Sequence, residues 1–225
     1  MKRISTNNNN VVDLPSRLNR RAAAELWRSP FHQILGDAAW SQLPDAVRRR
    51  FSTQVAPAET RVFTGEVVET KMNVAGYVLS QAARLVGAPL PLTTGATGPA
   101  NVTVCEDEKL GAQIWTRIYA RPGRFPQVIS SAKRLSGPTG LEECLGAGLL
   151  MRLQLIVEDG ALIFRSTSYA IELLQRTWTL PAWATPGQCD VIHRDVGGGQ
   201  FTFTLQLKHP IFGVMMRQVG LFREV

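Results

Sequence analysis

The sequence has few of the residues that cross-link small secreted proteins or bind metal ions. Its 225 residues include 3 cysteines and 3 histidines. Cys105, Cys144 and Cys189 lie far apart and form no Cys-x-x-Cys pair, so the sequence predicts neither a disulfide framework nor a zinc site. Such a low histidine content also argues against a His-rich metal site, and we predict no metal ion.

The common nucleotide-binding and hydrolase motifs are absent as well. The sequence has no glycine-rich phosphate loop that opens a helix, no His-Glu-x-x-His and no Gly-x-Ser-x-Gly. Gly197–Gly199 stands between two alternating segments, which indicates a hairpin turn rather than a phosphate site. We therefore predict that the protein uses no cofactor.

Long apolar runs are also missing. No stretch of about eighteen apolar residues occurs, so no membrane-spanning helix is predicted. The first ten residues lack the apolar core of a secretory signal. We therefore expect a cytoplasmic protein without a transmembrane segment.

The net charge of +7 is concentrated near the N-terminus. Residues 1–50 hold nine Lys and Arg against four Asp and Glu, whereas the rest of the chain holds sixteen against fourteen. Because the remainder is nearly neutral, we predict no specific binding of nucleic acid.

Two segments precede the expected fold. Residues 1–15 have no periodicity and are predicted to be a disordered arm, and residues 16–29 predict a basic amphipathic helix. This helix either lies solvated against the fold or docks on a partner protein or an anionic surface. Its cations are Arg17, Arg20, Arg21 and Arg28.

The apolar pattern then changes from helical to alternating. Residues 31–51 predict two short helices, interrupted at Gly36 and restarted at Pro44. Residues 61–72 alternate and predict a strand, and residues 75–86 predict another amphipathic helix.

Strand patterns dominate after Val102. Short alternating segments follow one another, and Asp159-Gly160 and Gly197–Gly199 predict two hairpin turns. The fold class we predict is α+β and β-rich, an antiparallel strongly curved sheet or barrel of about eight to ten strands with three or four mainly N-terminal helices. Residues 16–225 are expected to form a single domain, with a core fold over residues 31–223.

Three stretches carry a family resemblance: residues 31–51, 114–135 and 197–222, the last preceded by Glu-Asp-Gly-Ala-Leu-Ile-Phe at 158–164. In their order and spacing they resemble the bacterial family known as domain of unknown function 4166 (DUF4166), over about residues 31–223. The resemblance implies one compact domain with an accessory or ligand-handling role. Members of the family occur alone or fused behind nucleotide-binding reductase-like domains or membrane segments, and the resemblance implies no catalytic residue.

One predicted strand carries an unusual polar face. In residues 113–121, Trp115, Arg117 and Tyr119 alternate with small or apolar residues. An arginine between two aromatic rings can hold a carboxylate or phosphate while the rings cover an apolar body, so these three residues are ligand-binding candidates. In the alternative interpretation this face points outward, and Arg117 is solvated with its stem packed on the rings.

Other candidates lie at strand ends. His209 ends the alternating face of residues 201–207, where it could carry a proton at the mouth of a barrel or cap a turn. Glu142 and Glu143 precede the long hairpin that contains Arg152, a further ligand-binding candidate. An inward glutamate would pair with Arg117 or Arg152, and an unpaired one could act as an acid or base.

Three functions remain open from the sequence. The first is a binding module for a small, largely apolar or amphipathic ligand with an anionic group. The second is a metal-independent enzyme of the isomerase, cyclase or decarboxylase kind, with His209 and Glu143 as catalytic candidates. Convergence of these two residues with Arg117 in one cavity would favour an enzyme. The third is an interaction protein that docks through its basic N-terminal helix.

Overall fold

The protein is described here from a computed structural model. The residues it describes are 30–52, 55, 59–85, 87, 90–95, 97–107, 110–174 and 176–225. The predicted arm over residues 1–15 and the predicted basic helix over residues 16–29 lie outside these described residues.

The secondary structure consists of a few helices and many strands. The helices are α2 (Pro30–Trp40), α3 (Asp45–Ser52), α4 (Val74–Leu85) and the short 3₁₀ helix η1 (Ala182–Ala184). The strands are β1 (Thr60–Met72), β2 (Gly98–Asp107), β3 (Ala112–Arg121), β4 (Arg124–Arg134), β5 (Glu142–Gly146), β6 (Leu149–Glu158), β7 (Ala161–Leu173), β8 (Arg176–Thr179), β9 (Gln188–Gly197), β10 (Gln200–His209) and β11 (Gly213–Glu224).

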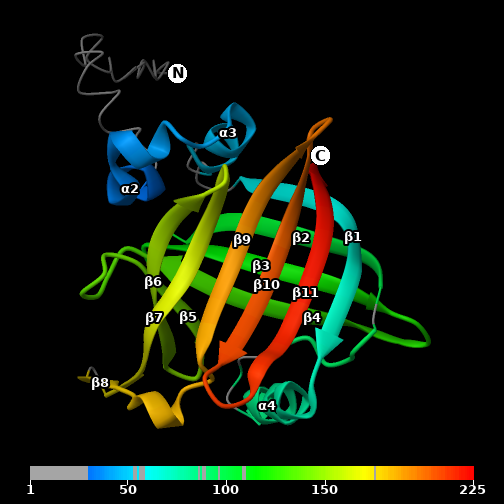
Figure 1. The fold of residues 1–225 in the computed structure, drawn as a ribbon, viewed down its shortest axis with the longest axis vertical. Coiled ribbons are helices and arrows are strands. Elements are labelled where there is room, and N and C mark those ends of the chain that lie inside the picture. The colour runs from blue at the N-terminus through cyan, green and yellow to red at the C-terminus, as the bar shows by residue number, and fades with distance from the viewer. Residues whose placement is uncertain are drawn as a thin grey trace, which may run out of the picture.

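The strands form one antiparallel sheet that closes on itself. The strand order is β6-β5-β4-β3-β2-β1-β11-β10-β9-β7-β8, and an additional β6–β7 pairing closes the ring (Figure 1). Ten strands make the barrel and β8 is the extra one. The first half of β7 pairs with β9 and its second half pairs with β8. The predicted β-rich barrel with antiparallel strands is confirmed, although β5 and β8 were not expected as strands.

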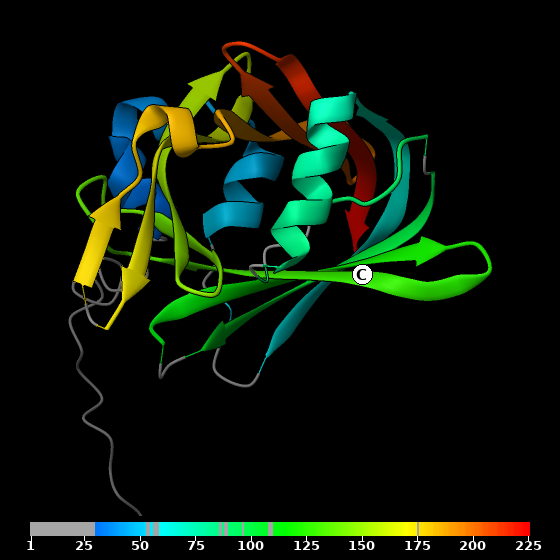
Figure 2. The same ribbon diagram turned by 90° about the horizontal axis from the view of Figure 1, so that it is seen from below.

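The helices occupy opposite ends of the barrel. Figure 1 shows α2 and α3 over one end and α4 at the other. Figure 2 looks onto the second end, where η1 and the turn between β10 and β11 lie around α4. The two ends of the barrel are therefore built from different parts of the chain.

An aromatic cluster fills the end beneath α2 and α3. The rings of Phe31 and Phe51 pack edge to face at 5.7 Å, and Phe31 packs in the same way against Phe164 of β7 at 5.5 Å. His193 of β9 lies 4.9 Å from Phe51 and 5.9 Å from Trp115 of β3. We call this group the aromatic plug, because its buried rings close this end of the barrel.

Local sequence explains where the helices break and how closely they pack. Gly36 adopts a positive φ of 75° and kinks α2, and Asp45 occupies the first turn of α3 directly after Pro44, as expected. Gly76 brings α4 against β11, since a Cβ at this position would lie 2.1 Å from the carbonyl oxygen of Met215. Only glycine permits so close an approach.

The direction of the β3 side chains resolves one of the open alternatives. Trp115, Arg117 and Tyr119 are all buried, whereas Ile114 and Ile118 on the opposite face remain partly exposed. The polar and aromatic face therefore points into the barrel. The alternative in which Arg117 is solvated on the outer face is wrong.

Candidate ligand-binding cavity

A cavity of about 770 Å³ occupies the half of the barrel next to α4. Most of its wall is apolar, with contributions from Val78 and Leu79 of α4, from Phe203 and Leu207 of β10, and from Met215 of β11. Small-molecule sites usually have volumes of about 300–1,000 Å³ and mainly apolar walls with a few polar groups. The cavity has these properties.

The main polar feature of the wall is a group of charged side chains around Glu143. Its carboxylate accepts a hydrogen bond from the Ser131 hydroxyl at 2.6 Å and lies 3.2 Å from the Lys133 ammonium. The guanidinium of Arg117 lies 3.8 Å from the same carboxylate oxygen. We call Arg117, Lys133 and Glu143 the charged triad. Two basic side chains face one carboxylate, so the triad carries one excess positive charge when both basic groups are protonated.

The protonation states in the triad are set by burial and by charge. Burial alone would raise the pKa of Glu143, but Lys133, Arg117 and the Ser131 hydrogen bond outweigh it and hold this pKa below its usual value. Burial lowers the pKa of Lys133, against the opposing effect of Glu143. Glu143 is therefore a carboxylate at neutral pH and a weak base.

Arg117 is the cation of the triad that lines the cavity together with Glu143. It donates a hydrogen bond to Ser131 at 3.3 Å, and its guanidinium lies 5.5 Å from the centre of the Phe203 ring. Among the described residues its Nε has no hydrogen-bond partner. Since a guanidinium has five N–H donors, Arg117 retains donors for a further acceptor.

Two tyrosines and a cysteine also line the cavity. Burial raises the pKa of Tyr119 and of Tyr169, so both phenols remain protonated. Burial likewise raises the pKa of Cys189 to about 12, which keeps this thiol protonated and unreactive. These side chains contribute neutral hydrogen-bonding groups and apolar surface to the wall.

His209 lies at the mouth of the cavity, beside the turn between β10 and β11. It lines the cavity, its Nδ1 accepts a hydrogen bond from the backbone N–H of Ile211 at 3.2 Å, and its ring stacks on Phe212 at 4.9 Å. The two alternatives from the sequence are thus compatible, since His209 caps the turn and also borders the cavity.

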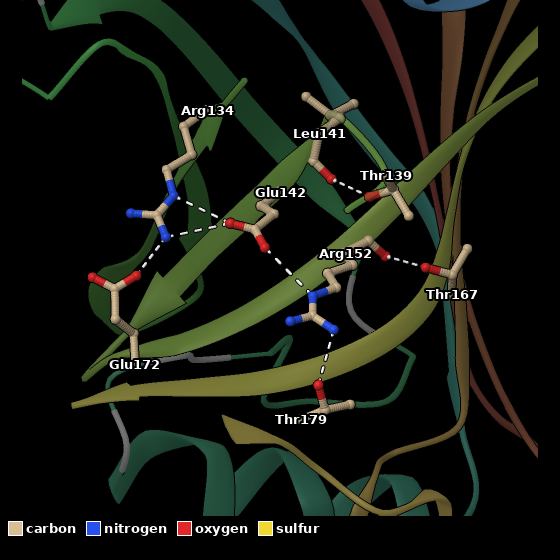
Figure 3. Close-up of polar contacts among 8 residues, drawn as sticks. All are labelled: Arg134, Thr139, Leu141, Glu142, Arg152, Thr167, Glu172 and Thr179. Carbon is tan, nitrogen blue, oxygen red and sulfur yellow. Dashed lines mark hydrogen bonds and ion pairs between the residues drawn. The ribbon is translucent and has the colours of Figure 1, made fainter. Parts of the chain in front are cut away.

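Two of the predicted ligand-binding residues lie elsewhere. Trp115 points into the barrel but belongs to the aromatic plug, where its ring stacks on Phe51 at 6.4 Å and its Nε1 donates to Gln113 at 2.8 Å. Arg152 lies on the outer face of β6, 3.5 Å from Glu142, and donates to Thr179 at 2.9 Å. Figure 3 shows Glu142 between Arg152 and Arg134.

This outer cluster joins five strands. Arg134 of β4 donates twice to Glu142 of β5, at 3.3 Å each, and also bonds Glu172 of β7 (Figure 3). Arg152 connects β6 to Thr179 of β8. Glu142 is 3% exposed although it lies on the outer face. These ion pairs and hydrogen bonds connect the strands on the outer face of the barrel, so we assign the cluster a structural role.

The structure places several of the candidates predicted from the sequence in the same cavity. Lys133 of the charged triad was not among the predicted residues. Arg117, Glu143 and His209 line the same cavity, and Tyr119 is a fourth candidate on its wall. Lys133 was not singled out, because its inward direction follows only from the register in which β4 residue Ser131 lies opposite Trp115 of β3. That register depends on the length of the β3–β4 turn, which the alternating pattern does not determine.

Within the described residues, no three His, Cys, Asp or Glu side chains cluster so as to hold a metal ion. Nor does any helix in this part of the chain have the length and apolar character needed to span a membrane.

The fold and the cavity together define a class: a closed antiparallel β-barrel that encloses a largely apolar cavity with a charged group on its wall. The chain belongs to the family described as "Domain of unknown function (DUF4166)", whose family model matches residues 43–222. A search of curated proteins found no match.

Proposed function

We propose that this protein binds a small, largely apolar molecule that carries an anionic group. The observation that carries this proposal is the excess positive charge of the charged triad at the wall of an apolar cavity of about 770 Å³. A carboxylate or phosphate beside Arg117 would compensate that charge and accept hydrogen bonds from its guanidinium. The apolar part of the ligand would lie against the walls formed by α4 and β10, with the hydrophobic effect as the driving force.

The test is a binding measurement with acids of this class. The full chain is titrated by calorimetry with fatty acids, hydroxy acids and isoprenoid acids, and palmitate is compared with hexadecanol, which has the same chain and no charge. We expect palmitate to bind more tightly than hexadecanol. Because a hydrogen bond to a charged group contributes about 1.5–3 kcal/mol, Arg117→Met should weaken palmitate binding roughly 10- to 100-fold and leave hexadecanol binding nearly unchanged.

Arg124→Met is the matched control, since Arg124 is exposed at the far tip of the β3–β4 hairpin. It should bind palmitate like the unmodified protein. The hexadecanol measurement also shows that the Arg117→Met barrel is intact. The proposal is wrong if no acid binds, or if Arg117→Met binds palmitate as tightly as the Arg124→Met control.

A second candidate is acid/base catalysis on the bound acid, favoured by the convergence of Arg117, Glu143 and His209 in one cavity. In that case His209 would carry the proton, because Glu143, held as a carboxylate by Lys133, is a weak base. Mass spectrometry of the bound acid after long incubation tests this candidate. Recovery of the acid unchanged would exclude it for that compound.

The hypothesis of docking through the basic helix at residues 16–29 concerns residues outside the described part of the chain. It stays a prediction, as does the cytoplasmic location.

A further inference from the structure

The mouth of the cavity is surrounded by exposed apolar side chains. More than half of the exposed large apolar residues of the described chain belong to three segments at this end, α4, residues 173–183 and the β10–β11 turn. We call them the mouth surface. Its residues are Val74, Tyr77, Val78, Leu85, Leu173, Leu174, Trp178, Trp183, Ile211, Phe212 and Val214.

The three segments are held next to one another. The Asn73 side chain, directly before α4, donates to the carbonyl oxygens of Phe212 at 3.0 Å and Val214 at 3.3 Å. Gly187, which follows η1, lies so close to β10 that a Cβ there would be 2.3 Å from the Lys208 carbonyl oxygen. Figure 2 shows α4, η1 and the β10–β11 turn around the same end. Hydrogen bonds and close packing therefore keep α4, η1 and the β10–β11 turn together at this end of the barrel.

The charged residues of the three segments all have one sign. The segments 73–85, 173–188 and 208–214 contain Arg84, Arg176 and Lys208 and no Asp or Glu. All three cations are exposed. The nearest carboxylate of β7, Glu172, is bonded to Arg134. A surface that combines exposed tryptophan and aliphatic side chains with uncompensated cations is complementary to an anionic lipid surface.

We infer that the mouth surface docks on anionic lipid bilayers. Trp183 is 86% exposed and Ile211 82% exposed, and both would enter the interface between headgroups and acyl chains. Arg84, Arg176 and Lys208 would lie among the anionic headgroups. Because Val78, Trp183 and Phe212 also line the cavity, docking places the opening of the cavity directly against the lipid. Docking itself requires no ligand, so it can be tested independently of the proposed function.

The experiment is co-sedimentation of the full chain with phosphatidylcholine vesicles, with and without phosphatidylglycerol. We expect binding that needs phosphatidylglycerol and weakens with salt. Trp183→Ser with Ile211→Ser should reduce binding by about tenfold or more, because two fully exposed apolar groups no longer enter the interface. Arg84→Gln and Lys208→Gln should each reduce it about fivefold.

Matched controls are Phe125→Ser and Arg124→Gln in the β3–β4 hairpin, which is not part of the mouth surface and where Phe125 is 91% exposed. Both should bind like the unmodified protein. The inference is overturned if the mouth variants and the control variants lose binding equally. It is also overturned if the mouth variants bind fully, since the cations before residue 30 would then account for binding. Failure of the unmodified protein to bind also overturns it.

A second readout reports the site of contact. In a background with Trp27→Phe and Trp178→Phe, vesicles with brominated acyl chains should quench the fluorescence of the protein. Adding Trp183→Phe should remove most of this quenching while the apolar character of the site is kept. Sedimentation velocity tests the other occupant, a second copy of the chain. Membrane docking is contradicted if the chain forms a dimer that Ile211→Ser dissociates and if brominated lipid does not quench the fluorescence of the protein.

Discussion

At the scale of single residues, the charged triad is the clearest departure from an apolar interior. Burying charges costs several kcal/mol for each ion, and the cost is offset only when every charge is paired. Glu143 is paired with both Lys133 and Ser131, whereas Arg117 has an unpartnered Nε among the described residues. The Oε2 atom of Glu143 likewise has no hydrogen-bond partner among the described residues, so both members of the triad that border the cavity have incomplete pairing, as expected of groups that act on a ligand.

Removing the carboxylate tests this description. Glu143→Gln leaves Lys133 buried without a counter-ion and should lower the free energy of unfolding by about 3–5 kcal/mol, measured by urea denaturation. Adding Lys133→Met should recover at least half of the loss, because the uncompensated charge is then gone. Glu66→Gln, at an exposed position of β1, is the control and should change stability by less than about 0.5 kcal/mol. A double variant less stable than Glu143→Gln alone would contradict the pairing.

His193, in the aromatic plug, makes the stability of the fold depend on pH. Its pKa lies well below the usual histidine value, first because of burial and then because of Arg50, Lys133 and Arg117. Below about pH 6.5 the unfolded chain therefore binds a proton that the folded protein does not, so stability falls as pH falls. The slope reaches about 1.4 kcal/mol per pH unit.

We expect His193→Phe to remove this slope between about pH 7 and pH 5, where the carboxylates contribute little. The measurement is urea denaturation at a series of pH values. His32→Gln, in α2, serves as control and should keep the slope of the unmodified protein. Parallel curves for His193→Phe and the unmodified protein would show that His193 is not the group responsible.

At the scale of elements, α4 is the helix that depends most on one small residue. A Cβ at Gly76 would lie 2.1 Å from the Met215 carbonyl oxygen, so Gly76→Ala must displace α4 from β11. We expect a loss of about 1–3 kcal/mol in the free energy of unfolding, despite the better helix propensity of alanine. Arg84→Ala, exposed on the same helix, should have little effect on thermal unfolding. Equal melting temperatures for the two variants would contradict the close packing of α4.

The sequence predicted the long elements well and the short ones poorly. Strands such as β1 and β10 alternate over ten or more residues, and Asp159-Gly160 marks the β6–β7 turn, so these elements were recognisable. β5 and β8 span 5 and 4 residues and are too short for a pattern. In β5 two adjacent glutamates are both buried, Glu143 inside the barrel and Glu142 on its outer face. Alternation cannot predict such a pair.

The candidate site could be predicted only in part, for the same reason. The alternation of β3 placed Trp115, Arg117 and Tyr119 on one face, but it could not say which face points inward, because a slip of one residue reverses the assignment. It also could not separate Trp115 in the plug from Arg117 at the cavity wall. That division depends on where α2 and α3 end inside the barrel, which is a property of tertiary packing.

At the scale of the whole molecule, one end of the barrel is filled by side chains and the other end holds a cavity. The aromatic plug fills one end, and the cavity with its mouth surface occupies the other. The helices α2 and α3 lie over the first end, and α4 lies at the second (Figures 1 and 2). The net charge of +7, which by itself would indicate a nucleic-acid binder, has two separate components. Residues 1–29 contribute +4 and residues 30–225 contribute +3, and the exposed cations around the mouth belong to this second part.

The pairing of β1 with β11 has a consequence for the timing of assembly. Phe63 lies opposite Glu224, so the closed barrel joins residues from nearly opposite ends of the fold. During synthesis the earlier strands emerge first, and β1 stays without one neighbour until β11 has left the ribosome. The cavity, which Met215 and Gln218 of β11 help to line, is therefore complete only after translation of this last strand. A nascent chain that stalls before β11 exposes an open sheet edge prone to aggregation.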